Sequence, residues 1–467
     1  MSSILVCTSP AESHVNPILD VVRALVGRGH RVRVLTGARF ADRIRALGAE
    51  PLALPAAADV LDDIELKGRP RGRRAMNEGL TDTFLRPGPP QLGAIEAALD
   101  AESVEAIVSD LAFVGTQLFA FRAGRPVLAA VGMFPLMVSS VDTGPFGLGV
   151  PPPRTRAHRL QYRMMQSIAR RVILAPVHRD VDRFYRANGL PGLGDLFFTD
   201  YLFQDGLLDL YGQFTVPSFE YPRSDLPAHV RFFGALTPPV TQKRALPDWW
   251  EQLDDSRPIV HVSQGTAANY DLGELIGPTL DGLAGEPVTV VVSTGAADGR
   301  AVGKLPSLPD NAFSAEFLPY DLLMPRIKAF VTNGGYGGLH AAMRHGVPIV
   351  VAGDTEDKLE TSARVAWSGV GINLKTGHPT PEKVRTAVRT VLSDPRYREA
   401  SARIGADLAA APGADGFVAA VEDIVAARRG SSVPPAPTIS EARVDAVSPP
   451  PFGASAEYER GGRPFRR

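Results

Sequence analysis

Four glycines within five residues form the most informative motif in the chain. They are Gly334, Gly335, Gly337 and Gly338, preceded by Asn333, between an apolar run and a helical segment. Glycines at such a junction let backbone N–H groups point at one spot, and the following helix N-terminus adds positive potential. Both features favour phosphate oxygens, so the run predicts a diphosphate site. A tight strand-to-helix turn that binds nothing is the alternative interpretation.

A candidate proton carrier, His14, follows the first predicted strand. We expect it in a loop before a helix over 16–28, at the sheet edge where open α/β domains bind ligands. A neutral imidazole there could act as a general base if a carboxylate fixed its tautomer. Asp110, at the end of another predicted strand, could supply that carboxylate. An exposed loop histidine and a helix-capping aspartate are the alternative, which spacing alone favours.

Other familiar chemistries are excluded by composition and spacing. The loop after the first strand, residues 9–15, has no glycine, which excludes a dinucleotide fingerprint, and no Gly-Lys-Ser/Thr follows a strand. A net charge of −1 over 467 residues argues against a nucleic-acid binder. The single cysteine, Cys7, excludes a disulfide framework and a multi-cysteine zinc site. Because it lies in an apolar run, we expect a buried structural thiol.

Short apolar runs that alternate with helical segments must position these residues. The runs lack period-two alternation, so they suit parallel strands covered on both faces, which indicates doubly wound α/β units. The predicted strands begin at residues 4, 31, 105, 126, 259, 288, 312, 329, 348 and 371. We predict an N-terminal unit over 1–235, a proline-rich linker over 236–244, a C-terminal unit over 245–430 and a disordered tail over 431–467.

The chain shows no targeting or membrane-spanning segment by sequence. Its longest apolar runs are far shorter than the ~20 residues that a span requires. The N-terminus enters the first strand without a cationic region or cleavage site. We therefore expect a cytoplasmic enzyme without stable membrane insertion.

Several ordered motifs together resemble the family 1 glycosyltransferases, which have the GT-B fold of two Rossmann-like domains facing each other across a cleft. The resemblance extends from residue 3 to about residue 429 and is weakest over 60–100 and 140–225, where such enzymes shape the acceptor pocket. It is carried by Ser13-His-Val-Asn-Pro17, Arg28-Gly-His-Arg-Val32, Val262-Ser-Gln-Gly-Thr266, Asn333 to Gly338, Gly346-Val-Pro348 and Gly353-Asp-Thr-Glu-Asp-Lys358.

The resemblance implies roles for individual residues. His14 corresponds to the base that deprotonates the acceptor, and Asp110 to the carboxylate that orients it. The donor-binding residues implied are Gly265, Thr266, Phe317, Leu318, Asn333, Gly334, Gly335, Gly337, Gly338, Asp357 and Lys358. Among them, Phe317 matches a ring that stacks on the nucleobase, with a core phenylalanine as the alternative, and Asp357 matches the acid that binds sugar hydroxyls.

The donor signature departs from the family pattern. Asn333 replaces a histidine, so this position never carries charge. Gly338 replaces a serine and Ala341, beside His340, replaces the glutamate that grips the ribose. Lys358 replaces a glutamine. The pattern resembles a bacterial and fungal branch of the family and leaves the nucleobase and sugar open.

The resemblance implies an inverting glycosyltransferase without metal or other cofactor. It would transfer a sugar from a UDP- or dTDP-linked donor, held by the C-terminal unit, to a hydroxyl of a small apolar natural product or lipid. No nucleic-acid partner is expected. The alternatives are a catalytically silent GT-B binding protein, favoured by the lost histidine and glutamate but opposed by His14 and Asp110, and a sugar-nucleotide epimerase.

Overall fold

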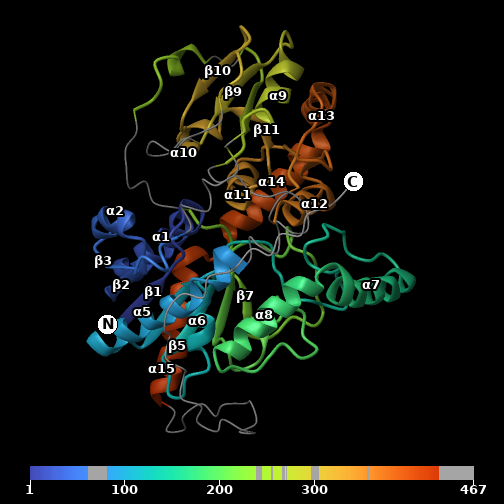
Figure 1. Cartoon of the computed structure of the whole chain (residues 1–467). Helices are drawn as coiled ribbons and strands as arrows, with labels where there is room; N and C mark the ends of the chain where they lie inside the picture. Colours follow the sequence, from blue (N-terminus) through green and yellow to red (C-terminus); the bar gives the residue numbers. More distant parts are fainter. Residues whose placement is uncertain are drawn as a thin grey trace, which may run out of the picture.

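Two parallel sheets, each covered by helices, make up the molecule (Figure 1). The computed structural model describes residues 1–60, 81–237, 245–253, 256–265, 269, 271–295, 304–354 and 357–430. The predicted α/β class with two doubly wound units is confirmed. The predicted linker from residue 238, the tail over 431–467 and Thr266 lie outside the described residues.

The first sheet belongs to the N-terminal unit and has seven strands within the described residues. In spatial order they are β3 (Glu50–Ala53), β2 (Arg31–Thr36), β1 (Ser3–Cys7), β4 (Ala106–Asp110), β5 (Val127–Gly132), β6 (Leu210–Gln213) and β7 (Val230–Phe232). Both faces are buried: Leu5 and Cys7 contribute to one core and Ile4 and Val6 to the other. The prediction that Cys7 is buried is confirmed, and burial raises the pKa of its thiol well above the ordinary value.

The second sheet belongs to the C-terminal unit, and all its strand pairs are parallel. In spatial order the strands are β10 (Ala312–Ala315), β9 (Thr289–Ser293), β8 (Ile259–Ser263), β11 (Ile327–Thr332), β12 (Ile349–Val351) and β13 (Gly371–Asn373). Val260 and Val262 face one core, whereas Ile259 faces the other. Both sheets have the order of a doubly wound fold, in which the chain leaves in opposite directions from two central strands.

Helices cover both faces of each sheet. Those of the N-terminal unit are α1 (Glu12–Gly27), α2 (Ala41–Ala46), α5 (Gly88–Ala101), α6 (Val114–Phe119), α7 (Arg156–Ile168) and α8 (Ala175–Ala187), with short helical segments η1 (Ala38–Phe40), η2 (Thr81–Leu85), η3 (Ala169–Ile173) and η4 (Tyr201–Phe203). Those that follow are η5 (Trp250–Gln252), α9 (Ile276–Leu283), α10 (Tyr320–Leu323), α11 (Tyr336–Arg344), α12 (Lys358–Ser368), α13 (Pro381–Ser393), α14 (Pro395–Ala410) and α15 (Gly413–Gly430). No single described helix is long and apolar enough to cross a membrane; α14 and α15 pass such a test only as a pair, bent by 41°.

The first helix begins earlier than predicted. It starts at Glu12, so His14 lies in its first turn and not in a loop. The predicted start at residue 16 places Pro17 in the first turn, where a missing N–H costs nothing. Pro17 instead lies inside α1, where its nitrogen cannot donate to the carbonyl one turn earlier. The predicted helix start, which relied on this proline, is therefore wrong by four residues.

The last helix corrects the predicted domain boundary. Although α15 follows the C-terminal unit in sequence, it packs on the first sheet and on α1. Phe417 is fully buried there, with its ring centroid 5.4 Å from those of Phe214 and Phe233. A Cβ on Gly212 of β6 would lie 2.5 Å from the Phe417 ring, so glycine is what lets this helix approach the strand. Residues 413–430 therefore belong in space to the N-terminal unit.

Candidate active site

His14 and Asp110 meet at the point where the first sheet reverses its strand order. Strands β1 and β4 are neighbours, and the chain leaves them toward opposite edges, which creates a crevice at their carboxyl ends. His14 enters this region from the first turn of α1, and Asp110 is the last residue of β4. The His14 Nδ1 lies 3.5 Å from the Asp110 Oδ1. The predicted pair is therefore brought together.

Asp110 is held as a carboxylate although it is fully buried. Its oxygens accept hydrogen bonds from the Thr8 hydroxyl at 2.9 Å and from the backbone N–H groups of Ser9 and Ala112, both at 2.6 Å. Burial acts to raise the pKa of this group, but the His14 imidazole and the bonds from Ser9 and Thr8 together hold it below the usual value. The side chain therefore presents negative charge to His14 near neutral pH.

His14 is buried between Asp110 and two aromatic rings. Only 8% of its side chain is exposed, and the rings of Phe134 and Phe84 lie 5.3 Å and 6.4 Å from it by centroid. The separation between Nδ1 and Asp110 exceeds a normal hydrogen bond, and Nδ1 has no other partner in the described part of the chain. Because a carboxylate can only accept, the Nδ1–H tautomer is favoured, which leaves the Nε2 lone pair available as a base.

The glycine-rich run occupies the same position in the second sheet. Strands β8 and β11 are its central neighbours, and the candidate donor residues follow their carboxyl ends. The Asn333 amide donates to the carbonyl of Gln264, which ties the two loops together. Gly265 and Gly334 have φ angles of 73° and 98°, which residues other than glycine rarely adopt. Glycine at these two positions therefore allows the backbone conformation of both loops.

The glycines at the start of α11 have different roles. A Cβ on Gly337 would meet nothing within 4 Å, whereas one on Gly338 would lie 3.3 Å from the Phe330 ring. Gly337 thus leaves open space beside the first, unpaired N–H groups of a nine-residue helix. Gly338 instead lets this helix pack closely on β11. A ligand can approach the helix N-terminus at Gly337.

Asp357 and Lys358 join this cluster from the loop after β12. They stand at the start of α12, with the Lys358 Nζ 2.8 Å from the Asp357 Oδ1. A Cβ on Gly353 would lie 2.0 Å from the Asn333 carbonyl oxygen and 2.9 Å from the Lys358 Cβ. The ends of β8, β11 and β12 therefore gather these donor-site candidates at one edge of the sheet.

Phe317 and Leu318, two of the predicted donor-binding residues, differ in accessibility. Phe317 is 45% exposed just beyond β10. Leu318 is fully buried in a core of the C-terminal unit. The chain turns this side chain inward and leaves only the backbone of Leu318 for a ligand, and its place in the donor site stays a prediction.

His340 does not replace the missing ribose-binding glutamate. Its Nε2 lies 3.0 Å from the Thr215 hydroxyl, across the contact between the two units, and its ring lies 4.3 Å from that of Tyr336. Burial lowers the pKa of His340 to about 3, so it stays neutral. The residue stabilises the contact between the units.

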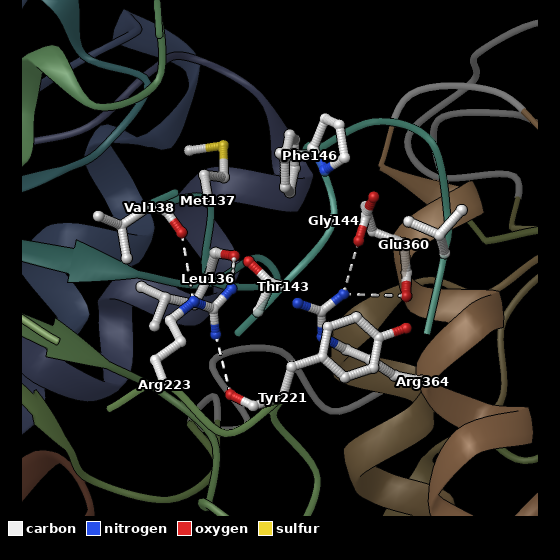
Figure 2. Close-up of a pocket in the computed structure, with 12 residues that line it drawn as sticks. Leu136, Met137, Val138, Thr143, Gly144, Phe146, Tyr221, Arg223, Glu360 and Arg364 are labelled. Carbon is white, nitrogen blue, oxygen red and sulfur yellow. Dashed lines mark hydrogen bonds and ion pairs between the residues drawn. The ribbon is translucent and has the colours of Figure 1, made fainter. Parts of the chain in front are cut away.

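A buried ionic cluster of Arg364, Glu220, Glu360 and Arg223, which the sequence did not reveal, also joins the two units. Figure 2 shows Arg364, Glu360 and Arg223. The Arg364 side chain is 1% exposed, and its Nε donates to the Glu220 Oε1 at 2.9 Å. Its Nη1 donates to the Glu360 Oε2 at 2.9 Å, and its guanidinium lies 4.2 Å from the centre of the Tyr221 ring. Arg223 forms a second ion pair with Glu220 at 3.2 Å. Burial acts to raise the pKa of Glu220, but Arg364 and Arg223 hold it below its usual value.

Glu360 extends this cluster toward the N-terminal unit. Its Oε1 accepts from the backbone N–H groups of Gly147 and Gly149 at 2.8 Å and 2.9 Å. The donor-site candidates Asp357 and Lys358 therefore lie within one helix turn of Glu360, which holds the loop that contains Gly147 and Gly149. The pocket that Arg223, Glu360 and Arg364 line together with residues of the 136–150 segment has a volume of about 10 Å³, room for roughly one water and too small for a substrate.

Comparisons with known proteins agree with this geometry. The family described as Erythromycin biosynthesis protein CIII-like, C-terminal domain, matches residues 279–424. The chain is 38% identical over 435 residues to 4'-demethylrebeccamycin synthase from Lentzea aerocolonigenes, covering 90% of this chain and 99% of that protein. It is 33% identical to UDP-glycosyltransferase 2 from Phaeomoniella chlamydospora, covering 91% and 96% of the two chains.

Solved structures support the fold independently. The glycosyltransferase of kitacinnamycin superposes with a TM-score of 0.67 at 21% identity, over 91% of this chain and 99% of that one. At this identity the likeness shows the shared two-unit architecture, while the full-length relatives above show common descent. The chain belongs to the family 1 glycosyltransferases.

Proposed function

We propose that this enzyme transfers a sugar from a nucleoside diphosphate to a hydroxyl of a small apolar acceptor, with inversion at the anomeric carbon. The buried His14–Asp110 pair carries the proposal. As the acceptor oxygen bonds to the anomeric carbon, its proton passes to the His14 Nε2. The bond between that carbon and the diphosphate oxygen breaks, and the nucleoside diphosphate leaves with the electron pair. Asp110 stabilises the imidazolium that results.

The donor would bind at the carboxyl edge of the second sheet. The N–H groups at the start of α11 and the open space beside Gly337 suit the diphosphate. Phe317 offers a ring for a uracil or thymine base, and Asp357 offers acceptors for sugar hydroxyls. Fixed backbone dipoles would stabilise the leaving diphosphate, and no metal or other cofactor is invoked. We propose the cytoplasm as the compartment.

The acceptor would bind beside His14 in the N-terminal unit. The rings of Phe84 and Phe134 flank the imidazole and favour an apolar, aromatic partner. The relative named above as a rebeccamycin synthase is a natural-product enzyme by name, which agrees with such an acceptor.

The decisive test is a transfer assay with the purified enzyme, UDP- and dTDP-sugars and a panel of aromatic alcohols. We expect glycoside formation coupled one-to-one to release of the nucleoside diphosphate, unchanged by EDTA, and slow donor hydrolysis without acceptor. Free UDP or dTDP should raise the thermal midpoint, since a ligand at a hundredfold excess over its Kd stabilises by about 2.7 kcal/mol. Donor binding without transfer or hydrolysis would indicate the silent binding protein instead.

Calorimetry on Gly337→Val tests the donor site separately. The added side chain should occupy the open space at the start of α11 and nearly abolish donor affinity. Asn333→Ala should weaken donor binding about tenfold, if the second hydrogen of its amide reaches the diphosphate. Unchanged affinity in Gly337→Val would mean that the glycines form only a turn and the diphosphate binds elsewhere.

A further inference from the structure

We propose that α7 and the adjoining η3 segment dock this enzyme onto the surface of an anionic lipid membrane. The observation is an outward-facing apolar stripe: the side chains of Leu160, Met164, Ile168 and Val172 are 62%, 59%, 49% and 64% exposed. They follow one another at intervals of four residues, and α7 has no buried residue. Helices of globular proteins normally turn such a stripe toward a core.

The next helix shows the normal arrangement. In α8, Val177, Val181 and Tyr185 have the same four-residue spacing, and all three are buried. The two helices are connected through η3 and lie in one segment of the chain, so their difference is one of orientation. The apolar side chains of α7 therefore face away from the part of the chain that the structure describes.

Contacts on the opposite side hold α7 in this orientation. The Tyr162 hydroxyl donates to the carbonyl of Pro151 at 2.8 Å, and the Gln166 amide reaches the carbonyl of Ser140 at 3.4 Å. Both residues lie more than 90° around the helix from Leu160, at about 100° per residue. Figure 1 places α7 at the periphery of the molecule, away from both sheets.

The positive charge around the apolar stripe indicates what kind of surface it binds. No acidic residue occurs between Asp142 and Asp180, whereas the segment contains the arginines at 154, 156, 159, 163, 170, 171 and 179. Arg159 pairs with Asp142 and Arg170 with Asp195. Arg156, Arg163 and Arg171 are exposed and form no ion pair with any residue that the structure describes.

This combination fits a membrane surface better than a second copy of the chain. Arg156 and Arg163 lie beside the stripe, within about 60° of Leu160 around the helix. An apolar stripe bordered by arginines places its side chains at the headgroup boundary while the guanidinium groups meet lipid phosphates. Pairing two copies of α7 would instead bring arginine against arginine. The helix would lie in the interface and would not span it.

Vesicle flotation with the full-length protein tests the inference. We expect binding to vesicles of phosphatidylcholine with about a third phosphatidylglycerol, little binding to phosphatidylcholine alone, and release by high salt. Arg156→Gln with Arg163→Gln should weaken binding by roughly fivefold for each arginine lost. Leu160→Ser with Met164→Ser should weaken it at least as much. Because these side chains are exposed, the thermal midpoint should stay unchanged in both double variants.

A matched control carries Leu308→Ser and Arg403→Gln, which remove an exposed leucine and an exposed arginine from the C-terminal unit. It should bind vesicles like the unmodified protein. Equal flotation of all variants, or no binding to anionic vesicles, would overturn the inference. So would a concentration-dependent dimer that Leu160→Ser with Met164→Ser abolishes, since the stripe would then pair two copies. None of these outcomes depends on the proposed transfer reaction.

Discussion

Asp110 and Glu220 are both fully buried carboxylates with lowered pKa values, but different partners compensate their charge. Asp110 is held by a hydroxyl, two backbone N–H groups and one imidazole. Glu220 also accepts from two backbone N–H groups, those of Leu136 and Tyr221, but it differs in being paired with two guanidinium groups, those of Arg364 and Arg223. Neutral donors leave the net charge beside His14 free to stabilise an imidazolium. Permanent cations cancel the charge of Glu220 and make it a cross-link between the units.

The difference separates a site for chemistry from a site for assembly. The proposed proton carrier, His14, needs a neighbouring negative charge that no permanent cation cancels, which Asp110 provides. A guanidinium does not lose its proton in proteins, so the Glu220 cluster does not take part in proton transfer. We therefore expect changes near Asp110 to act mainly on turnover, and changes near Glu220 mainly on the free energy of unfolding.

Replacing His14 should give the largest effect. His14→Ala is expected to lower kcat by ~10²–10⁴-fold, the usual contribution of a positioned general base. Donor affinity should persist, because the donor site lies in the other unit. The assay should use an alcohol acceptor, since a phenol ionises more readily without a base. Near-normal turnover of the alcohol would show that the pair is not catalytic.

Removing Arg364 should have the largest effect on stability. Arg364→Ala leaves Glu220 and Glu360 without their shared buried cation, which should lower the free energy of unfolding by about 3–5 kcal/mol. Denaturant unfolding followed by circular dichroism measures it. The control is Arg389→Ala, which breaks an ion pair with Glu286; because this arginine is 66% exposed, the loss of stability should be far smaller. Equal losses in the two variants would remove the distinction between a buried and a surface pair.

Exchanging each buried carboxylate for its amide compares the two sites directly. Asp110→Asn should lower kcat by releasing the His14 tautomer, while its mismatched amide costs about 1–3 kcal/mol of stability. Glu220→Gln should cost on the order of 3 kcal/mol and leave kcat unchanged under folding conditions. Steady-state kinetics and unfolding curves on both proteins are required. The opposite division, with kcat lost in Glu220→Gln alone, would contradict the assigned roles.

The dependence of the free energy of unfolding on pH in the acid range should give the smallest effect. A carboxyl whose pKa is lower in the folded state adds stability above its unfolded pKa, and this stability is lost as pH falls through the folded value. The free energy of unfolding should therefore fall below about pH 4, the ordinary range for Asp and Glu. Glu220→Gln and Asp110→Asn should each flatten this slope by up to about 1.4 kcal/mol per pH unit. Asp42→Asn, at a side chain 97% exposed, should not.

Local sequence signals determined much of this protein. Strands β2 and β8 begin at the predicted residues, because a buried parallel strand is a short apolar run that can be seen residue by residue. The strand, glycine loop and helix over 327–344 follow from glycines placed where helix N–H groups point outward. His14 and Asp110 could be placed at one sheet edge because parallel strands align their carboxyl ends. The family resemblance added their expected roles.

Only the tertiary structure decided which distant segments meet. Glu220 and Arg364 are 144 residues apart, and neither has a local pattern that predicts an ion pair. The same holds for α15, whose apolar face would suit either sheet, and for Phe84 and Phe134 beside His14. It also holds for α7, because helical periodicity shows that a stripe exists but not whether it faces a core or the solvent. Periodicity and turns arise from neighbours along the chain, whereas these contacts arise from packing that the whole chain determines.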